Sequence, residues 1–181
     1  MQHRVSSRVL LSTLLGGGDS EEAMGMAIDS QDCIYIYGMT RSRDFPVTQG
    51  AFCMTKPRLG GQAAFVAKFD ADASHLIYCT FICSDAEVSA PTINDLKVDD
   101  DGCAWIVGST IWAGFPTTAG ALSRVYGGNT DGYLLKLSAN GSQALYSTFI
   151  GGDGVDSINR LWLEGESVYM AGYNTYGDFP A

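Results

Sequence analysis

The chain has 181 residues, of which 46% are hydrophobic and 17% charged, and its 20 acidic against 11 basic residues give a net charge of −9. This composition can bury a core and argues against intrinsic disorder. The acidic balance argues against binding to a nucleic-acid backbone, and no apolar run approaches the roughly 18 residues of a membrane span.

The first element in the chain is a short apolar run close to the N-terminus. Met1 to Gly18 contains arginines, the apolar segment Val9 to Leu15 and then small residues, as a secretory signal does. However, Ser12 to Gly17 matches Ser147 to Gly152, and Cys79 to Ser84 lies between them at steps of 67 and 68 residues. We therefore predict a β-strand belonging to a repeat at this position, and no signal peptide in this chain.

The next elements are four short apolar runs that return, in the same order, in a second repeat. They are rich in Val, Ile, Tyr and Phe, and Gly, Asp, Asn or Ser separates them, which predicts strands joined by turns. No window has a sustained helical period. Four strands in a unit of this size are typical of a β-propeller blade, whose inner strands are buried between neighbouring blades. The runs in the first repeat are Met24 to Asp29, Cys33 to Gly38, Ala63 to Phe69 and Leu76 to Ile82.

The sequence pattern of these repeats resembles the SBBP family of bacterial β-propeller repeats. In that family a G-I-A-V-D strand, a Y-V-T-G strand, a D-F-P-x-T-x-G-A segment and a D-A-F-V-A-K-L strand follow one another. The resemblance extends from about Val9 to Ala181 and implies an all-β fold and a secreted or cell-envelope protein. The matching segments are Gly25 to Asp29, Ile34 to Gly38, Asp44 to Phe52, Gly60-Gly61 and Ala64 to Phe69, then Phe115 to Ala121 and Asp131 to Leu137.

The repeat boundaries divide the chain into about two and a half blades of four antiparallel strands. We expect residues 1–17 to be the outer strand of a preceding blade, 18–84 the first blade, 85–152 the second, and 153–181 the first half of a third. A propeller ring needs roughly four to eight blades. The expected fold is therefore an incomplete ring of eleven strands. Its expected partners are the remaining blades of a larger parent protein, of which this is a fragment, or further copies of itself by self-association.

Long links between the second and third strands of each repeat are the candidate binding surface. They run about 25 residues, from Gly38 to Phe65 and from Gly108 to Tyr133, and long loops on a rigid scaffold often bind ligands. Aromatic, Arg and Asn side chains there suit a protein or a glycan. For Trp112 and Tyr176 packing is an equal alternative, and the repeated Phe45, Phe115 and Phe179 are expected to pack on their own blades. The candidate ligand-binding residues are Arg41, Arg43, Trp112, Tyr173, Asn174 and Tyr176.

Acidic side chains occupy the links between successive repeats. Converging carboxylates are the ligands of a hard cation such as calcium, although acidic loop residues are also commonly just solvated. Asp99 to Asp101, followed by Gly102, lies in a different turn, where Asp and Gly are expected because both residues favour turns. No other cofactor is indicated. The candidate metal ligands are Asp19, Glu22, Asp85, Asp153 and Asp156.

No catalytic motif occurs, so we expect a non-enzymatic binding or structural scaffold module. The alternatives are a metal-dependent propeller lyase or hydrolase that uses the acidic links, and a truncated reading frame without independent function. The five cysteines have no framework spacing and are expected to be unpaired small hydrophobes, which fits poorly with the oxidising compartment that the resemblance implies.

Overall fold

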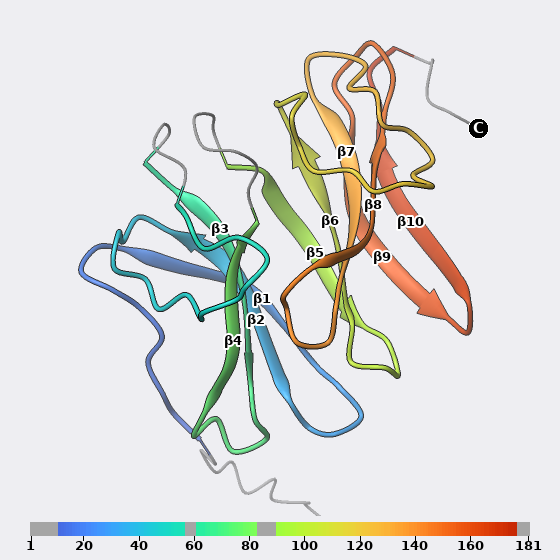
Figure 1. Cartoon of the computed structure of the whole chain (residues 1–181). Helices are drawn as coiled ribbons and strands as arrows, with labels where there is room; N and C mark the ends of the chain where they lie inside the picture. The colour runs from blue at the N-terminus through green and yellow to red at the C-terminus, as the bar shows by residue number, and fades with distance from the viewer. Residues whose placement is uncertain (1–10, 57–60, 83–89, 177–181) are drawn as a thin grey trace, which may run out of the picture.

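The computed structural model describes residues 11–56, 61–82 and 90–176 and is all-β there, with no helix (Figure 1). Ten strands form three antiparallel sheets with the orders β1-β2-β3-β4, β5-β6-β7-β8 and β10-β9, called the first, second and third sheet. Consecutive strands pair throughout. The bounds are β1 Glu21–Ile28, β2 Ile34–Thr40, β3 Ala63–Phe69, β4 Leu76–Ile82, β5 Thr92–Val98, β6 Ala104–Thr110, β7 Asp131–Leu137, β8 Ala144–Ile150, β9 Ser157–Glu164 and β10 Ser167–Tyr173.

A glycine repeated in all three sheets and an aspartate repeated in the first two explain the shape of the hairpin formed by the first two strands. Gly38, Gly108 and Gly172 lie near the end of the second strand beside a β-bulge, where a side chain would collide with the backbone of the first strand. At the other end, Asp29 Oδ1 accepts hydrogen bonds from the backbone N–H groups two and four residues later, and Asp99 Oδ1 does the same. These short-range bonds fix the turn and therefore the register of the hairpin.

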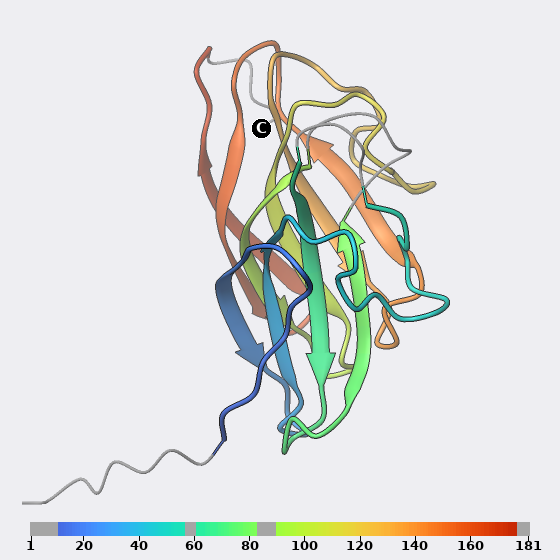
Figure 2. The ribbon, with the colours of Figure 1, turned by 90° about the vertical axis from the view of Figure 1, so that its left-hand side faces the viewer.

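The three sheets lie side by side with their first strands adjacent, as two perpendicular views show (Figures 1 and 2). β1 lies against β5, and β5 lies against β9. The largest apolar cluster fills the space between the first and second sheets, with Tyr35, Ile93 and Leu135 among its buried members. A smaller cluster, which includes Val107 and Ile158, joins the second sheet to the third.

Burial is most complete in the third strand of a sheet rather than in the second. All seven residues of β3 are buried, whereas β2 alternates between buried and half-buried positions. The sequence had predicted burial of both inner strands between neighbouring blades. The difference arises because the link after β2 folds back over the first sheet, so that Phe45 and Val47 cover the outer side of β3.

Two expectations from the sequence differ from the structure. Residues 11–17 are not in a strand, and the rest of the expected outer strand lies outside the described residues. None of the described strands pairs with this segment. In addition, Cys53 is disulfide-bonded, so the expectation that all five cysteines are unpaired was wrong. Cys33, Cys79 and Cys103 are free, and the last two are buried as predicted.

Candidate functional site

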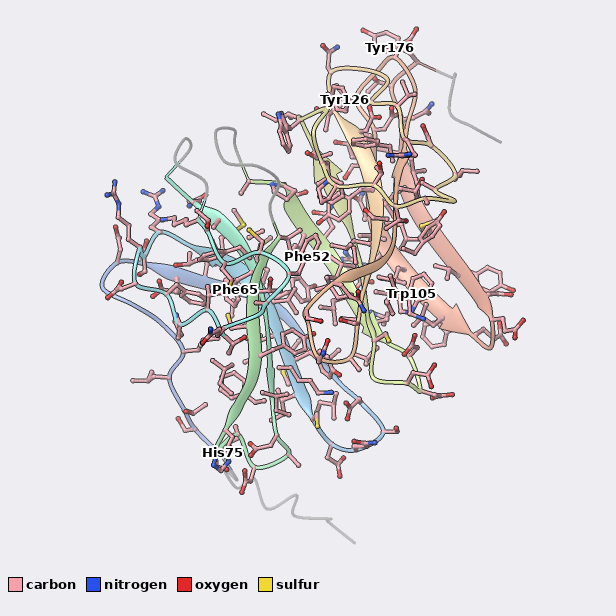
Figure 3. All side chains as sticks on the ribbon, in the orientation of Figure 1. Phe52, Phe65, His75, Trp105, Tyr126 and Tyr176 are labelled. Atoms are coloured by element: carbon pink, nitrogen blue, oxygen red, sulfur yellow. The ribbon has the colours of Figure 1, made fainter. Side chains whose placement is uncertain are left out.

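The candidate ligand-binding residues of the long links do not form one site. Arg41 and Arg43 are exposed beside the first sheet, while Trp112 is half-buried against the cluster between the first and second sheets. Tyr173 and Asn174 share a cavity of about 410 Å³ with Ile158 and Met170. Figure 3 shows Tyr176 at the same end of the molecule as Tyr126, and Tyr176 is largely exposed. The structure therefore brings only Tyr173 and Asn174 together.

The repeated Phe-Pro pairs serve packing, as the sequence predicted. Phe45 is buried with its ring centroid 4.5 Å from that of Phe65, and Phe115 is buried 4.4 Å from Tyr133. Phe179 lies outside the described residues. The two described phenylalanines hold their links onto their own sheets and are not available to a ligand.

The candidate metal ligands are also separated. Asp19, Glu22 and Asp153 are exposed, Asp156 is fully buried, and Asp85 lies outside the described residues. Within the described part of the chain, no group of three or more His, Cys, Asp or Glu side chains is placed to hold a metal ion. No helix that could cross a membrane occurs there either.

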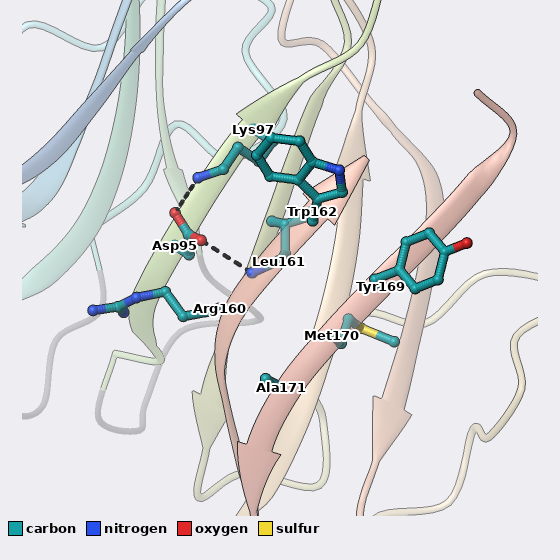
Figure 4. Close-up of a pocket in the computed structure, with 8 residues that line it drawn as sticks. All are labelled: Asp95, Lys97, Arg160, Leu161, Trp162, Tyr169, Met170 and Ala171. Carbon is teal, nitrogen blue, oxygen red and sulfur yellow. Dashed lines mark hydrogen bonds and ion pairs between the residues drawn. The ribbon is translucent and has the colours of Figure 1, made fainter. Parts of the chain in front are cut away.

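A groove lies over the third sheet and the neighbouring β5 (Figure 4). Its cavity volume is about 420 Å³, and it combines aromatic with charged side chains. Trp162 and Tyr169 are 62% and 56% exposed although they are large and apolar. The residues lining it are Asp95, Lys97, Arg160, Leu161, Trp162, Tyr169, Met170 and Ala171.

Asp95 connects this groove to the second sheet. Its Oδ2 accepts a hydrogen bond of 3.0 Å from the backbone N–H of Leu161, and its Oδ1 accepts one of 2.8 Å from Lys97 Nζ. Next to it, Asn94 Nδ2 donates to the Ile158 carbonyl at 2.9 Å. Side chains of β5 thus hold the free backbone edge of β9, and they fix the third sheet against the second.

The aromatic residue of the groove occupies a repeated position. Tyr35, Trp105 and Tyr169 are the second residue of the apolar run in β2, β6 and β10. Tyr35 is fully buried and its hydroxyl donates to the Gly102 carbonyl of the second sheet. Trp105 packs with the cluster that joins the second and third sheets. In both cases the residue touches the next sheet, whereas Tyr169 is 56% exposed.

One exposed turn contains Ser, His and Asp, but its geometry is not catalytic. His75 Nδ1 lies 2.7 Å from Ser74 Oγ and 2.8 Å from Asp70 Oδ2. A catalytic triad uses opposite ring nitrogens for the acid and the nucleophile, whereas here a single nitrogen contacts both. Figure 3 places His75 at the far end of the molecule from Tyr176. The turn is explained by local hydrogen bonding.

Sequence reasoning missed one buried acid. Asp131, at the start of β7, is fully buried, and its carboxylate accepts hydrogen bonds from the backbone N–H groups of Gly127 and Gly128. Burial raises the pKa of Asp131 despite these two bonds, and the charge of Asp156 adds to the increase. The available signal was a difference between repeats, because the first repeat has Ala63 at this position.

In comparisons with known proteins, no family model and no curated protein matches this chain. The SBBP resemblance therefore rests on the motifs of the sequence itself.

Proposed function

We propose that this chain is a β-propeller repeat segment that acts as a non-enzymatic scaffold, with the open face of the third sheet as its binding surface. The partner that this face fits is a further four-stranded sheet of the same repeat, supplied by the rest of a larger protein or by a second copy. The disulfide at Cys53 supports the secreted or cell-envelope location that the resemblance implies.

Stacking of successive sheets supports this proposal. Sheets that follow one another in sequence pack with their first strands adjacent, and an apolar cluster lies at each junction. Repeat proteins are built in this way, because each unit contacts only its neighbours and the terminal units keep one uncovered face.

The observation that carries the proposal is the environment of one repeated aromatic position. Tyr35 and Trp105 pack against the following sheet, while Tyr169 is exposed beside Trp162 in the groove. Large contiguous apolar surfaces on a protein commonly mark contact sites. Because the equivalent residues of the first and second sheets contact the following sheet, we expect the surface around Tyr169 to bind a sheet as well.

Light scattering behind a sizing column, over a range of concentrations, tests this proposal. We expect the mass of the chain to rise with concentration, and Tyr169→Glu to keep it monomeric because a charge would be buried in the contact. Leu145→Glu is the matched control, since Leu145 is an exposed apolar residue on β8, away from the groove. A Leu145→Glu variant that dissociates equally well would contradict the proposal, and a parent chain that stays monomeric throughout would exclude a second copy as the source of the sheet.

A further inference from the structure

Two fully buried carboxylates lie together where the second sheet meets the third. Asp131 and Asp156 are both 0% exposed. The segment before β7 runs parallel to the segment before β9, with Thr130 bridged to Val155 one residue before each acid. A Cβ atom placed on Gly151 would lie 2.7 Å from Asp156 Oδ2 and 3.1 Å from Asp131 Cγ, so both carboxyl groups border the same glycine.

The hydrogen bonds at this place do not satisfy both acids. Asp131 accepts bonds of 2.9 and 3.2 Å from two backbone N–H groups, and Asp156 Oδ2 accepts one of 2.8 Å from Gly152. Asp156 Oδ1 is buried and has no hydrogen-bond partner. No described Lys, Arg or His forms an ion pair with either acid. Two adjacent buried charges without a counter-charge are strongly disfavoured.

A second unpartnered polar atom lies across the ladder from Asp156. The β9–β10 register pairs Ser157 with Tyr173, so the next position places Asn174 opposite Asp156. Val155 N donates to Thr175 Oγ1 at 2.8 Å, which shows that the two segments of the chain stay together beyond the strands. Asn174 Nδ2 is buried without a partner. Because a half-turn of the amide exchanges its nitrogen and oxygen, the Asn174 oxygen can occupy this buried position.

The equivalent place in the first repeat shows what is different here. Glu21 occupies the position of Asp156, and its carboxylate also lies 2.7 Å from a Cβ atom placed on the matching Gly16. Glu21 accepts hydrogen bonds from the hydroxyls of Thr40 and Ser42, whereas Asn174 and Tyr176 stand at those two positions beside the third sheet. In the first sheet this carboxylate thus has two hydroxyl donors. Asp156 lacks these two donors and lies next to a second carboxylate, Asp131 of the second sheet.

We propose that Asp131 and Asp156 bind a divalent cation of the calcium type, with the Asn174 amide oxygen as a third ligand. Carboxylate and amide oxygens are the ligands that calcium prefers. A bound cation would neutralise both buried acids and give the unpartnered Asp156 oxygen a partner. Because Asp131 belongs to the second sheet and Asp156 to the third, the ion would also tie the two sheets together. This inference does not depend on whether the third sheet recruits a further sheet.

Calorimetric titration of the EDTA-treated full chain with calcium chloride tests the site. We expect one calcium per chain and, at about a hundredfold excess over Kd, a rise of roughly 5 °C in the thermal midpoint. Asp131→Asn should abolish both the heat and the rise, because it removes one of the two charges. Asn174→Ala, which perturbs the fold less, should weaken binding by about tenfold.

Glu21→Gln is the matched control, since it neutralises the equivalent acid of the first repeat, and it should leave calcium binding unchanged. The proposal is overturned if the parent chain shows no calcium-dependent heat. It is equally overturned if Asp131→Asn keeps the full response, or if lowering the pH stabilises the protein while calcium has no effect. The last result would mean that the two acids share a proton.

Discussion

Asp29 and Asp99 each organise one hairpin turn and anchor one lysine. Asp99 Oδ2 lies 2.8 Å from Lys136 Nζ and accepts a hydrogen bond of 2.9 Å from Trp105 Nε1. The lysine nitrogen in turn lies 4.7 Å from the centre of the Trp105 ring, a cation–π arrangement. Asp29 holds Lys68 over Tyr35 in the same way. A repeated set of three side chains thus fixes the aromatic ring that contacts the next sheet.

The environment of the Asp99 carboxylate leads us to expect that its contribution to stability decreases at low pH. Burial alone would raise its pKa, but hydrogen bonds from Lys136, Trp105 and the Cys103 N–H outweigh burial and lower the pKa below the ordinary value of 3.8. A carboxylate whose pKa is lower in the folded than in the unfolded state stabilises the fold at pH values above the unfolded-state pKa. This stabilisation is lost as the pH falls through the folded-state pKa. Asp99→Asn should therefore cost about 1–2 kcal/mol at pH 7, and much less at pH 2.

Urea unfolding at pH 7 and pH 2 measures this difference. Asp100→Asn is the control, because Asp100 is the neighbouring exposed acid of the same turn and should change the free energy of unfolding little at either pH. A cost of Asp99→Asn that is the same at both pH values would show that the charge of Asp99 does not stabilise the fold.

At the scale of elements, the third sheet depends on the second for its position. β9 and β10 form a sheet of only two strands, and such a hairpin is marginally stable alone. Its support comes from apolar contacts and from Asp95 and Asn94, which reach the backbone of β9. We therefore expect Asp95→Ala to loosen the third sheet selectively, since the Leu161 N–H loses its buried acceptor at a cost of about 1–3 kcal/mol.

Hydrogen exchange measured by mass spectrometry checks this expectation. Amides of residues 157–173 should exchange about tenfold faster or more in Asp95→Ala, whereas amides of β3 should be unchanged. Asp44→Ala is a suitable control, because it removes an acid whose Oδ1 accepts from the exposed Gly18 N–H, far from β9. Uniform acceleration across all three sheets would show that the third sheet does not open separately.

The strands themselves could be predicted closely from the sequence because the repeats align with one another. The predicted runs Ala63 to Phe69 and Leu76 to Ile82 are the observed bounds of β3 and β4. Repetition does not report contacts that differ between repeats. Asp131 looked like an ordinary strand residue, and its meeting with Asp156 depends on two links packing side by side. The Cys53 disulfide was missed for a similar reason, since cysteine spacing along the chain does not reveal distance in space.

At the scale of the whole molecule, the second sheet is the central layer. Its cluster with the first sheet is the largest, and its other face supports the third sheet. In a stack where each unit contacts only its neighbours, stability spreads through the shared junctions. A defect in the second sheet should therefore weaken the first sheet more than an equally buried defect in the third.

Cys79 of β4 provides a probe for this coupling, because it is a free thiol of the first sheet and burial raises its pKa to about 12. Since the thiolate is the reactive form, Cys79 should react with a thiol reagent only after the first sheet unfolds. Leu135→Ala removes a fully buried side chain from the second sheet and should cost 2–5 kcal/mol, so Cys79 should react at a clearly lower urea concentration.

Leu161→Ala makes the same change at an equally buried position of the third sheet, and it should shift the reaction of Cys79 little. Identification of the labelled cysteine by peptide mass separates Cys79 from Cys33 and Cys103. If both variants lower the urea concentration equally, the three sheets unfold as one cooperative unit. If neither does, the first sheet is stable without its neighbour, and the apolar cluster between the first two sheets contributes little to holding it folded.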